Sequence, residues 1–206
     1  MELKGKTLPG YRIYEYMLII NPNEALQEKI KGVRADFDKA FNVEAKIGGR
    51  PNVGLVQFMQ YEMMETRIRA KLKLIGLGYP PFKIELKDFG SYPSHTIYIN
   101  MTSRLPVQNL IREIREQTQS LMKLNSETKP HFLQEPHITV GRKLKPWQYE
   151  KAWLEYSQKH FTGKFVADAM LLLKRRDKTS SWEIAERFEF ANLPVHNVLA
   201  EQGELF

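Results

Sequence analysis

The feature that most constrains the fold is a repeated order of secondary-structure elements. Residues 14–89 and 95–173 each read as strand, helix, strand, helix, strand, from apolar residues at strand or helix periodicity. The spacing also agrees, because His137 follows Asn52 by 85 residues (137 minus 52) and Phe165 follows Phe82 by 83 (165 minus 82). Two series of the same order and nearly equal length predict an internal duplication, in which two lobes face each other across a pseudo-twofold cleft.

The predicted strands are residues 14–20, 53–58, 82–89, 95–101, 136–141, 165–173 and 182–190. The predicted helices follow Asn23, run over 62–75, begin near Pro106 and begin at Pro146. The polar stretch 125–135 is predicted to be a loop.

This pattern predicts an α+β fold in one bilobal domain over 1–206. Its approximate lobes are 11–90 and 95–190, followed by a C-terminal tail, 191–206. One domain is expected because no linker is long or polar enough to separate two independent units. The motif strands would then form the walls of the cleft between the lobes.

Composition narrows the class of protein. Hydrophobic residues make up 42% and aromatic residues 11%, which is enough for a core and excludes global disorder. No apolar run approaches membrane-spanning length, and no signal-like segment follows Met1, so we expect no membrane partner. Cysteine is absent, which excludes disulfides and thiolate metal sites and favours a cytoplasmic protein.

The charge of the chain favours anionic partners. The formal net charge is +7 and the pI about 9.4, so nucleotides and nucleic acid are candidate ligands. A basic enzyme with no polymer partner remains the alternative, because charge alone does not separate the two. The sequence leaves any protein partners unknown.

One short motif suggests chemistry. His137 and Thr139 lie two residues apart at the start of a predicted strand, so their side chains point to the same face. An imidazole that moves a proton beside a hydroxyl that donates a hydrogen bond suits a phosphate. A buried structural histidine is the alternative for His137. At the equivalent place in the first series stand Asn52 and Gly54, which supply neither group.

With these motifs in a duplicated frame, the chain resembles the two-histidine (2H) phosphoesterase superfamily, in its RNA 2′,5′-ligase and cyclic phosphodiesterase branch. The resemblance covers nearly the whole chain and includes the end of the first strand, Ile20-Asn21-Pro22, the segment 80–93, and residues 135–142. It implies a bilobal fold with two antiparallel-rich sheets flanked by helices around a central phosphate-binding cleft. It also implies no metal and no cofactor.

In such proteins each lobe contributes one His-x-Thr/Ser motif, with one imidazole as base and the other as acid around a 2′,3′-cyclic or 2′,5′ phosphodiester. The resemblance therefore makes His137 and Thr139 the candidate catalytic residues. Asn52 occupies the other motif but does not titrate near neutral pH. Because loss of one acid/base partner typically costs about 10²–10⁴-fold in rate, we predict absent, weak or altered phosphodiesterase activity.

Three further residues are candidate substrate-binding groups. Arg142 directly follows the motif strand and could bind phosphate oxygens, or could belong to a solvated basic rim; Asn52 could hydrogen-bond the ligand. His95 is expected at a strand start or cleft rim, with the less favoured alternative that it replaces the missing imidazole. His131, His160 and His196 are expected to lie outside the site. No pair of histidines has metal-ligand spacing.

Two functions of different classes follow from the sequence. In the first, the chain binds a nucleotide or RNA phosphate through His137 and Thr139, helped by Arg142 and Asn52. In the second, it is a binding or scaffold protein that keeps the fold without a phosphate ligand, as the erased first motif would allow. A third possibility is an enzyme that pairs His95 with His137.

Overall fold

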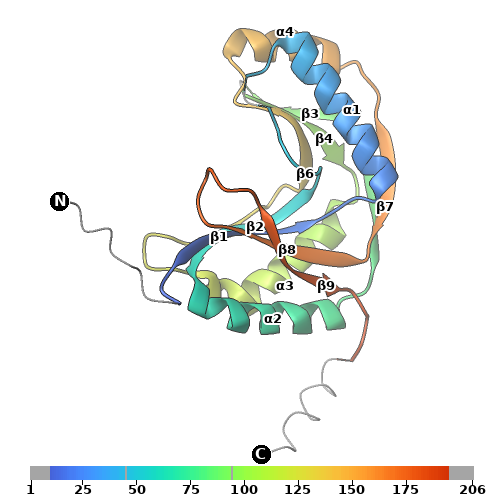
Figure 1. The fold of residues 1–206 in the computed structure, drawn as a ribbon. Helices are drawn as coiled ribbons and strands as arrows, with labels where there is room; N and C mark the ends of the chain where they lie inside the picture. Colours follow the sequence, from blue (N-terminus) through green and yellow to red (C-terminus); the bar gives the residue numbers. More distant parts are fainter. Residues whose placement is uncertain (1–9, 45, 94, 195–206) are drawn as a thin grey trace, which may run out of the picture.

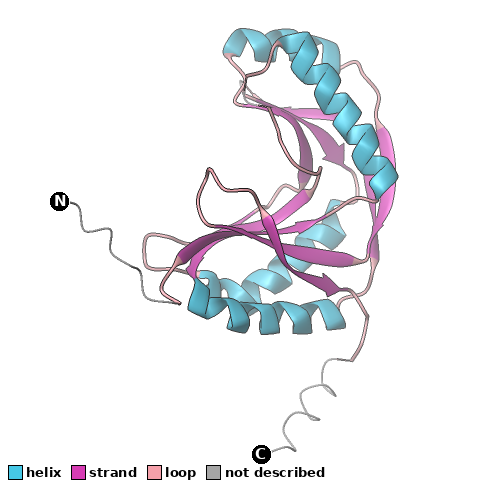
Figure 2. Ribbon diagram, viewed as in Figure 1, coloured by secondary structure: helices cyan, strands magenta, loops and turns pink. Residues whose placement is uncertain are grey.

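Two antiparallel sheets with helices on their outer sides make up the described part of the computed structural model, which comprises residues 10–44, 46–93 and 95–194 (Figures 1 and 2). Sheet A has the strand order β5-β2-β1-β8-β9. Its strands are β1 (Ile13–Ile20), β2 (Val53–Tyr61), β5 (His131–Phe132), β8 (Ala169–Arg175) and β9 (Glu183–Glu189). Sheet B has the order β6-β4-β3-β7. Its strands are β3 (Phe82–Tyr92), β4 (Thr96–Met101), β6 (His137–Arg142) and β7 (Thr162–Ala167).

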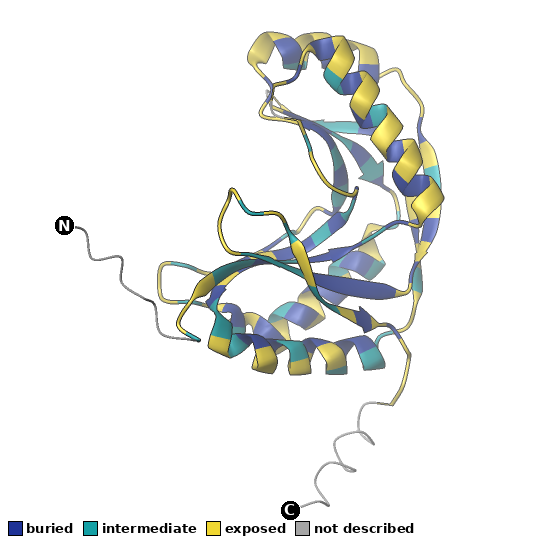
Figure 3. Ribbon diagram, viewed as in Figure 1, coloured by how far each residue is buried: buried dark blue, intermediate teal, exposed yellow. Residues whose placement is uncertain are grey.

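The helices divide between the two sheets. Helices α1 (Glu24–Phe41) and α4 (Pro146–Tyr156) pack on sheet B, where α1 contacts β6 and β7 and α4 contacts β4. Helices α2 (Glu65–Gly78) and α3 (Arg104–Met122) pack on sheet A and on each other, and a 3-10 turn (Glu62–Met64) precedes α2. Buried residues concentrate where helices meet sheets (Figure 3). The α+β architecture expected from the sequence is therefore confirmed.

Helix α1 shows how the sequence specifies its element. The Asn23 side chain accepts a hydrogen bond from the Leu26 amide at 3.0 Å and caps the first turn. Its apolar stripe includes Leu26, Ile30 and Phe37, all buried as predicted. Val33 lies at the margin of the core, whereas its neighbour Arg34 is buried. A charged residue thus occupies part of the inner face of this helix.

The order of elements agrees with the predicted repeat, with β5 as an addition inside the stretch 125–135. The predicted single strand 165–173 is wrong: it is two strands, β7 and β8, separated at Asp168. The chain breaks there because β7 pairs with β3 in sheet B, whereas β8 pairs with β1 in sheet A.

Consequently the sheets do not divide the chain at the expected lobe boundary between 90 and 95. Strand β3 of the first series belongs to sheet B, and β8 and β9 of the second series belong to sheet A. Periodicity identifies a strand but not its partner, so this exchange was not predictable from apolar spacing. Most of the expected tail, including His196, lies outside the described residues.

Candidate functional site

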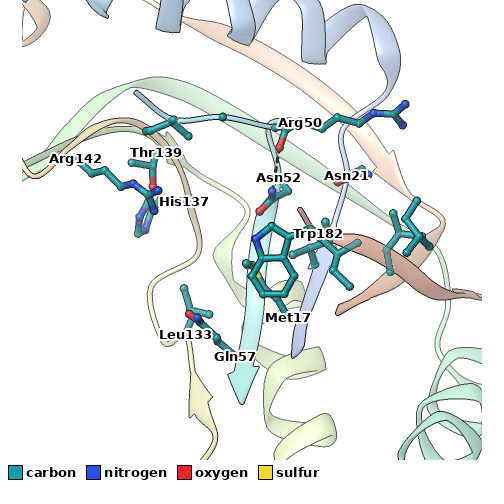
Figure 4. Close-up of a pocket in the computed structure, with 18 of the residues that line it drawn as sticks. Met17, Asn21, Arg50, Asn52, Gln57, Leu133, His137, Thr139, Arg142 and Trp182 are labelled. Atoms are coloured by element: carbon teal, nitrogen blue, oxygen red, sulfur yellow. Dashed lines mark hydrogen bonds between the residues drawn. The ribbon is translucent and has the colours of Figure 1, made fainter. Parts of the chain in front are cut away.

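A cleft of about 580 Å³ lies between the two sheets and brings the motif strands together (Figure 4). Sheet B contributes His137, Thr139 and Arg142 from β6, and the opposite side contributes Asn52, which immediately precedes β2, and Gly54 of β2. These are four of the five residues predicted for the site, together with the glycine of the erased motif. The sequence prediction that both motifs face one cavity therefore agrees with the lining of the cleft.

His137 is held in one orientation and one tautomer. Its Nδ1 lies 2.8 Å from the main-chain oxygen of Glu135. A carbonyl oxygen only accepts hydrogen bonds, so Nδ1 carries the proton and Nε2 keeps a free lone pair. The ring of Tyr98 packs beside the imidazole, with 4.6 Å between ring centroids. Nε2 is thus the atom of His137 that can exchange a proton with a ligand.

Burial lowers the pKa of His137 from its ordinary value, and Glu135 opposes this shift while Arg104 adds to it. The imidazole is therefore predominantly neutral near pH 7. In that state it can accept a proton from a nucleophile but has none to give from Nε2. The neutral imidazole of His137 is therefore suited to the role of general base.

A β-bulge brings Arg142 to the same face as Thr139. Thr139 pairs with Tyr98 of β4. Gly141 pairs with Ile97, so β6 contains one more residue than β4 between these two pairs. The extra residue reverses the alternation of side chains, which otherwise would place Arg142 on the opposite face. Figure 4 shows Arg142 beside His137 and Thr139.

The segment around Asn52 repeats the local geometry of the segment around His137. Asn52 donates a hydrogen bond from Nδ2 to the main-chain oxygen of Arg50 at 3.0 Å, two residues earlier, as His137 does with Glu135. Strand β2 also carries a bulge at the equivalent place, because its register against β1 shifts between Leu18 and Ile19. An amide therefore makes, before β2, the same anchoring contact that the imidazole of His137 makes on β6.

Two further residues complete this comparison. Gln57 lines the cleft 85 positions before Arg142 (142 minus 57), so an uncharged amide stands where the second strand has a guanidinium. The place of the missing hydroxyl is occupied, because a Cβ on Gly54 would lie 3.3 Å from both methyl carbons of Leu133. The Leu133 amide bonds the Leu55 oxygen at 2.9 Å, which fixes this side chain over the glycine.

Arg34 is a site residue that the sequence did not indicate. Its side chain lines the cleft although the residue is only 7% exposed, and its Nε donates to the main-chain oxygen of Thr139 at 3.0 Å. Within the described residues, its Nη1 and the Oδ1 of Asn21, another cleft residue, are buried without hydrogen-bond partners. Arg34 looked like one of many charged positions in α1, so sequence alone carried no signal for it.

The far wall of the cleft is apolar. It is formed by Trp182, which immediately precedes β9, and by five residues of sheet A: Met17, Ile19, Leu171, Leu173 and Ile184. The Arg175 guanidinium lies 4.4 Å from the centroid of the Trp182 ring and supports it from outside the cleft lining. The sequence placed Trp182 only at the start of a strand, and its position in the cleft depends on the pairing of β9 with β8.

His95 does not line the cleft. It is exposed, and its Nδ1 lies 2.9 Å from the main-chain oxygen of Pro93. His95 therefore has no contact with the cleft that would support a substrate-binding role. The alternative, in which His95 supplies the second imidazole, has no support from such a contact either. His131 is exposed on β5 and borders a separate cavity that also reaches His137, and His160 pairs with Asp88 at 3.2 Å.

The described residues contain no group of three or more His, Cys, Asp or Glu side chains placed to hold a metal ion. None of the described helices is long and apolar enough to cross a membrane.

Comparison with known proteins agrees with this geometry. Residues 22–179 match the model of the 2′-5′ RNA ligase superfamily. A relative from Geobacillus thermodenitrificans (strain NG80-2), named "Putative phosphoesterase", is 24% identical over 181 residues, which are 84% of this chain and 95% of the relative.

Solved structures share the fold. E. coli LigT complexed with 3′-AMP aligns with a TM-score of 0.65 at 16% identity, over 87% of this chain and 99% of LigT. TT0787 of Thermus thermophilus aligns with a TM-score of 0.64 at 12% identity, over 87% of this chain and 100% of that chain. At these identities the likeness to the solved structures extends to the fold.

Proposed function

The chain belongs to the 2′-5′ RNA ligase superfamily, and from this we propose that it binds a nucleotide or an RNA phosphate in the cleft between its sheets, with phosphodiesterase activity that is weak or absent. The observation that carries the proposal is the placement of His137, Thr139 and Arg142 on one face of β6, opposite Asn52. An imidazole, a hydroxyl and a guanidinium on one surface suit a phosphoryl group.

Each group has a distinct task in this proposal. Thr139 and Arg142 donate hydrogen bonds to phosphoryl oxygens, and the Asn52 amide contacts the ligand from the opposite strand. In hydrolysis of a 2′,3′-cyclic phosphate, Nε2 of His137 accepts a proton from the attacking water. The leaving ribose oxygen then has to take its proton from solvent, because the amide of Asn52 does not titrate near neutral pH. The rate is lower by about 10²–10⁴-fold than with two imidazoles.

The shape of the cleft supports a nucleotide over a bare phosphate. Its lining combines polar groups on β6 and beside Asn52 with an apolar wall that includes Trp182, as expected for a ligand with a charged end and a flat base. LigT, which shares the fold, has been crystallised with 3′-AMP. This ligand is therefore a suitable first probe.

The test is a titration of 3′-AMP into the wild-type protein by calorimetry, beside His137→Ala and His95→Ala. We expect binding to the wild type and to His95→Ala, since His95 lies outside the cleft, and weakened binding to His137→Ala. Hydrolysis of 2′,3′-cyclic AMP is measured on the same proteins. Equal affinity of the two variants would refute a role for His137.

The scaffold hypothesis makes the opposite prediction. A protein that keeps the fold without a phosphate ligand would bind neither 3′-AMP nor inorganic phosphate at millimolar concentration. That result would favour the second function proposed from the sequence.

A further inference from the structure

Arg34 presents an unusual combination of burial and unused hydrogen-bonding capacity. The residue is 93% buried, its Nε is bonded to Thr139, and its Nη1 has no partner among the described residues. A buried cation without a counter-charge destabilises a fold unless something else compensates it. No Asp or Glu of the described chain lies within ion-pair distance of this guanidinium.

The guanidinium does not occupy the same position as the His137 and Thr139 side chains. Strand β6 is at the edge of sheet B. The Thr139 oxygen that accepts from Arg34 is a main-chain atom, and main-chain oxygens of a strand lie near the plane of the sheet. The His137 and Thr139 side chains instead project from the face of the sheet. Arg34 thus lies beside the phosphate position proposed above.

The charge of the cleft exceeds what one phosphodiester requires. Its lining includes Arg34, Arg50 and Arg142, and none of its described residues is Asp or Glu. Burial, followed by repulsion from Arg142, lowers the pKa of Arg34 to about 10, and Asp38 opposes this shift. An anion bound between Arg34 and Arg142 would relieve that repulsion.

Asn21 adds an acceptor on the sheet A side. Its Oδ1 is buried, lines the same cleft and has no hydrogen-bond partner among the described residues. A ligand that carries a hydroxyl near a phosphate would supply both missing contacts, one to Arg34 and one to Asn21.

We propose that Arg34 is the centre of a second phosphate subsite, so that the cleft selects nucleotides with two separate phosphate groups. Resting on the proposed function, this inference identifies the substrate class as a nucleoside bisphosphate or the end of an oligonucleotide that includes a flanking phosphate. The reacting phosphate lies on His137 and Thr139, and the second phosphate lies on Arg34.

The test compares two ligands by calorimetry at one ionic strength: adenosine 3′-monophosphate and adenosine 3′,5′-bisphosphate. A new hydrogen bond to a buried cation should make the wild type bind the bisphosphate at least about tenfold more tightly. Arg34→Met should reduce this preference to roughly twofold or less. The matched control, Arg50→Met, also removes one cleft cation and should weaken both ligands while the preference remains.

The outcomes separate the two proposals. If the wild type binds 3′-AMP but gains no more than about twofold from the second phosphate, the subsite is refuted and the proposed function stands. If it binds neither ligand, both fail. Equal loss of preference in Arg34→Met and Arg50→Met would refute the subsite in favour of general electrostatic attraction. If circular dichroism shows that Arg34→Met does not fold, the ratio of the affinities for the bisphosphate and for 3′-AMP, measured in the wild type and in Arg34→Lys, decides whether the subsite exists.

Discussion

Replacing Asn52 by histidine is expected to restore the missing half of the site. The structure supplies the anchor, because Asn52 already donates to the Arg50 oxygen at 3.0 Å, as His137 does to the Glu135 oxygen at 2.8 Å. The Nδ1 of an introduced imidazole would take over this bond and turn Nε2 into the cleft. Both strands carry a bulge at the equivalent place, so the two imidazoles would face a ligand symmetrically.

The expected gain follows from the role of the new group. A general acid is typically worth about 10²–10⁴-fold in rate, which corresponds to roughly 3–5 kcal/mol in the activation barrier. The lower end is expected here, because Gly54 still lacks the hydroxyl of a complete motif. We therefore predict that Asn52→His raises kcat/KM for 2′,3′-cyclic AMP by about 10²-fold. The pH profile should become bell-shaped, with His137 as base and the introduced imidazole as acid.

The assay is hydrolysis of 2′,3′-cyclic AMP, followed by chromatography of the products. Asn52→Gln is the matched control, since it keeps an amide without a titratable proton and should stay at the wild-type rate. Asn52→His combined with His137→Ala should lose the gain. Adding Gly54→Thr should help only together with Leu133→Ala, because Leu133 fills the space. A folded Asn52→His protein that binds 3′-AMP and hydrolyses no faster than the wild type would refute the reasoning.

Three further predictions follow from burial and packing. Gly141→Ala should lower the free energy of unfolding by about 1–3 kcal/mol, because its Cβ would lie 2.3 Å from a ring carbon of Phe37 that the packed α1 cannot readily move. Gly32→Ala, exposed on the same helix with no atom within 4 Å, should instead raise it by about 0.5–1 kcal/mol; urea unfolding measures both, and equal signs would contradict the argument. Burial holds the pKa of His137 below its ordinary value, so the unfolded chain takes up a proton at His137 before the folded protein does as the pH falls. The contribution of neutral His137 to the free energy of unfolding is therefore complete above a pH of about 6.5 and is lost as pH falls through the folded-state pKa. Urea titrations from pH 7.5 to 5 should show this component in the wild type but not in His137→Gln. Finally, 3′-AMP should quench tryptophan fluorescence in the wild type but much less in Trp182→Phe, and identical quenching would exclude this wall as the base position.

The sequence by itself determined the order of elements and the position of the intact motif. Three local features carried this information: apolar spacing, the Asn23 cap and the two-residue interval of His137 and Thr139. They can be interpreted without knowing which strands pair with one another. The offset of 85 residues between Asn52 and His137, close to the 83 residues between Phe82 and Phe165, also indicated that Asn52 and His137 stand in equivalent places, and both line the cleft.

Tertiary structure decided what depends on a partner. The exchange of β3 and β8 between sheets is set by strand pairing, which periodicity does not encode. The bulge that turns Arg142 into the cleft exists only relative to β4. The buried position of Arg34 arises because α1 packs on sheet B against β6, where the main-chain oxygen of Thr139 accepts a hydrogen bond from its Nε. Such contacts join residues far apart in the chain. Tertiary packing therefore determined which charged side chains line the cleft.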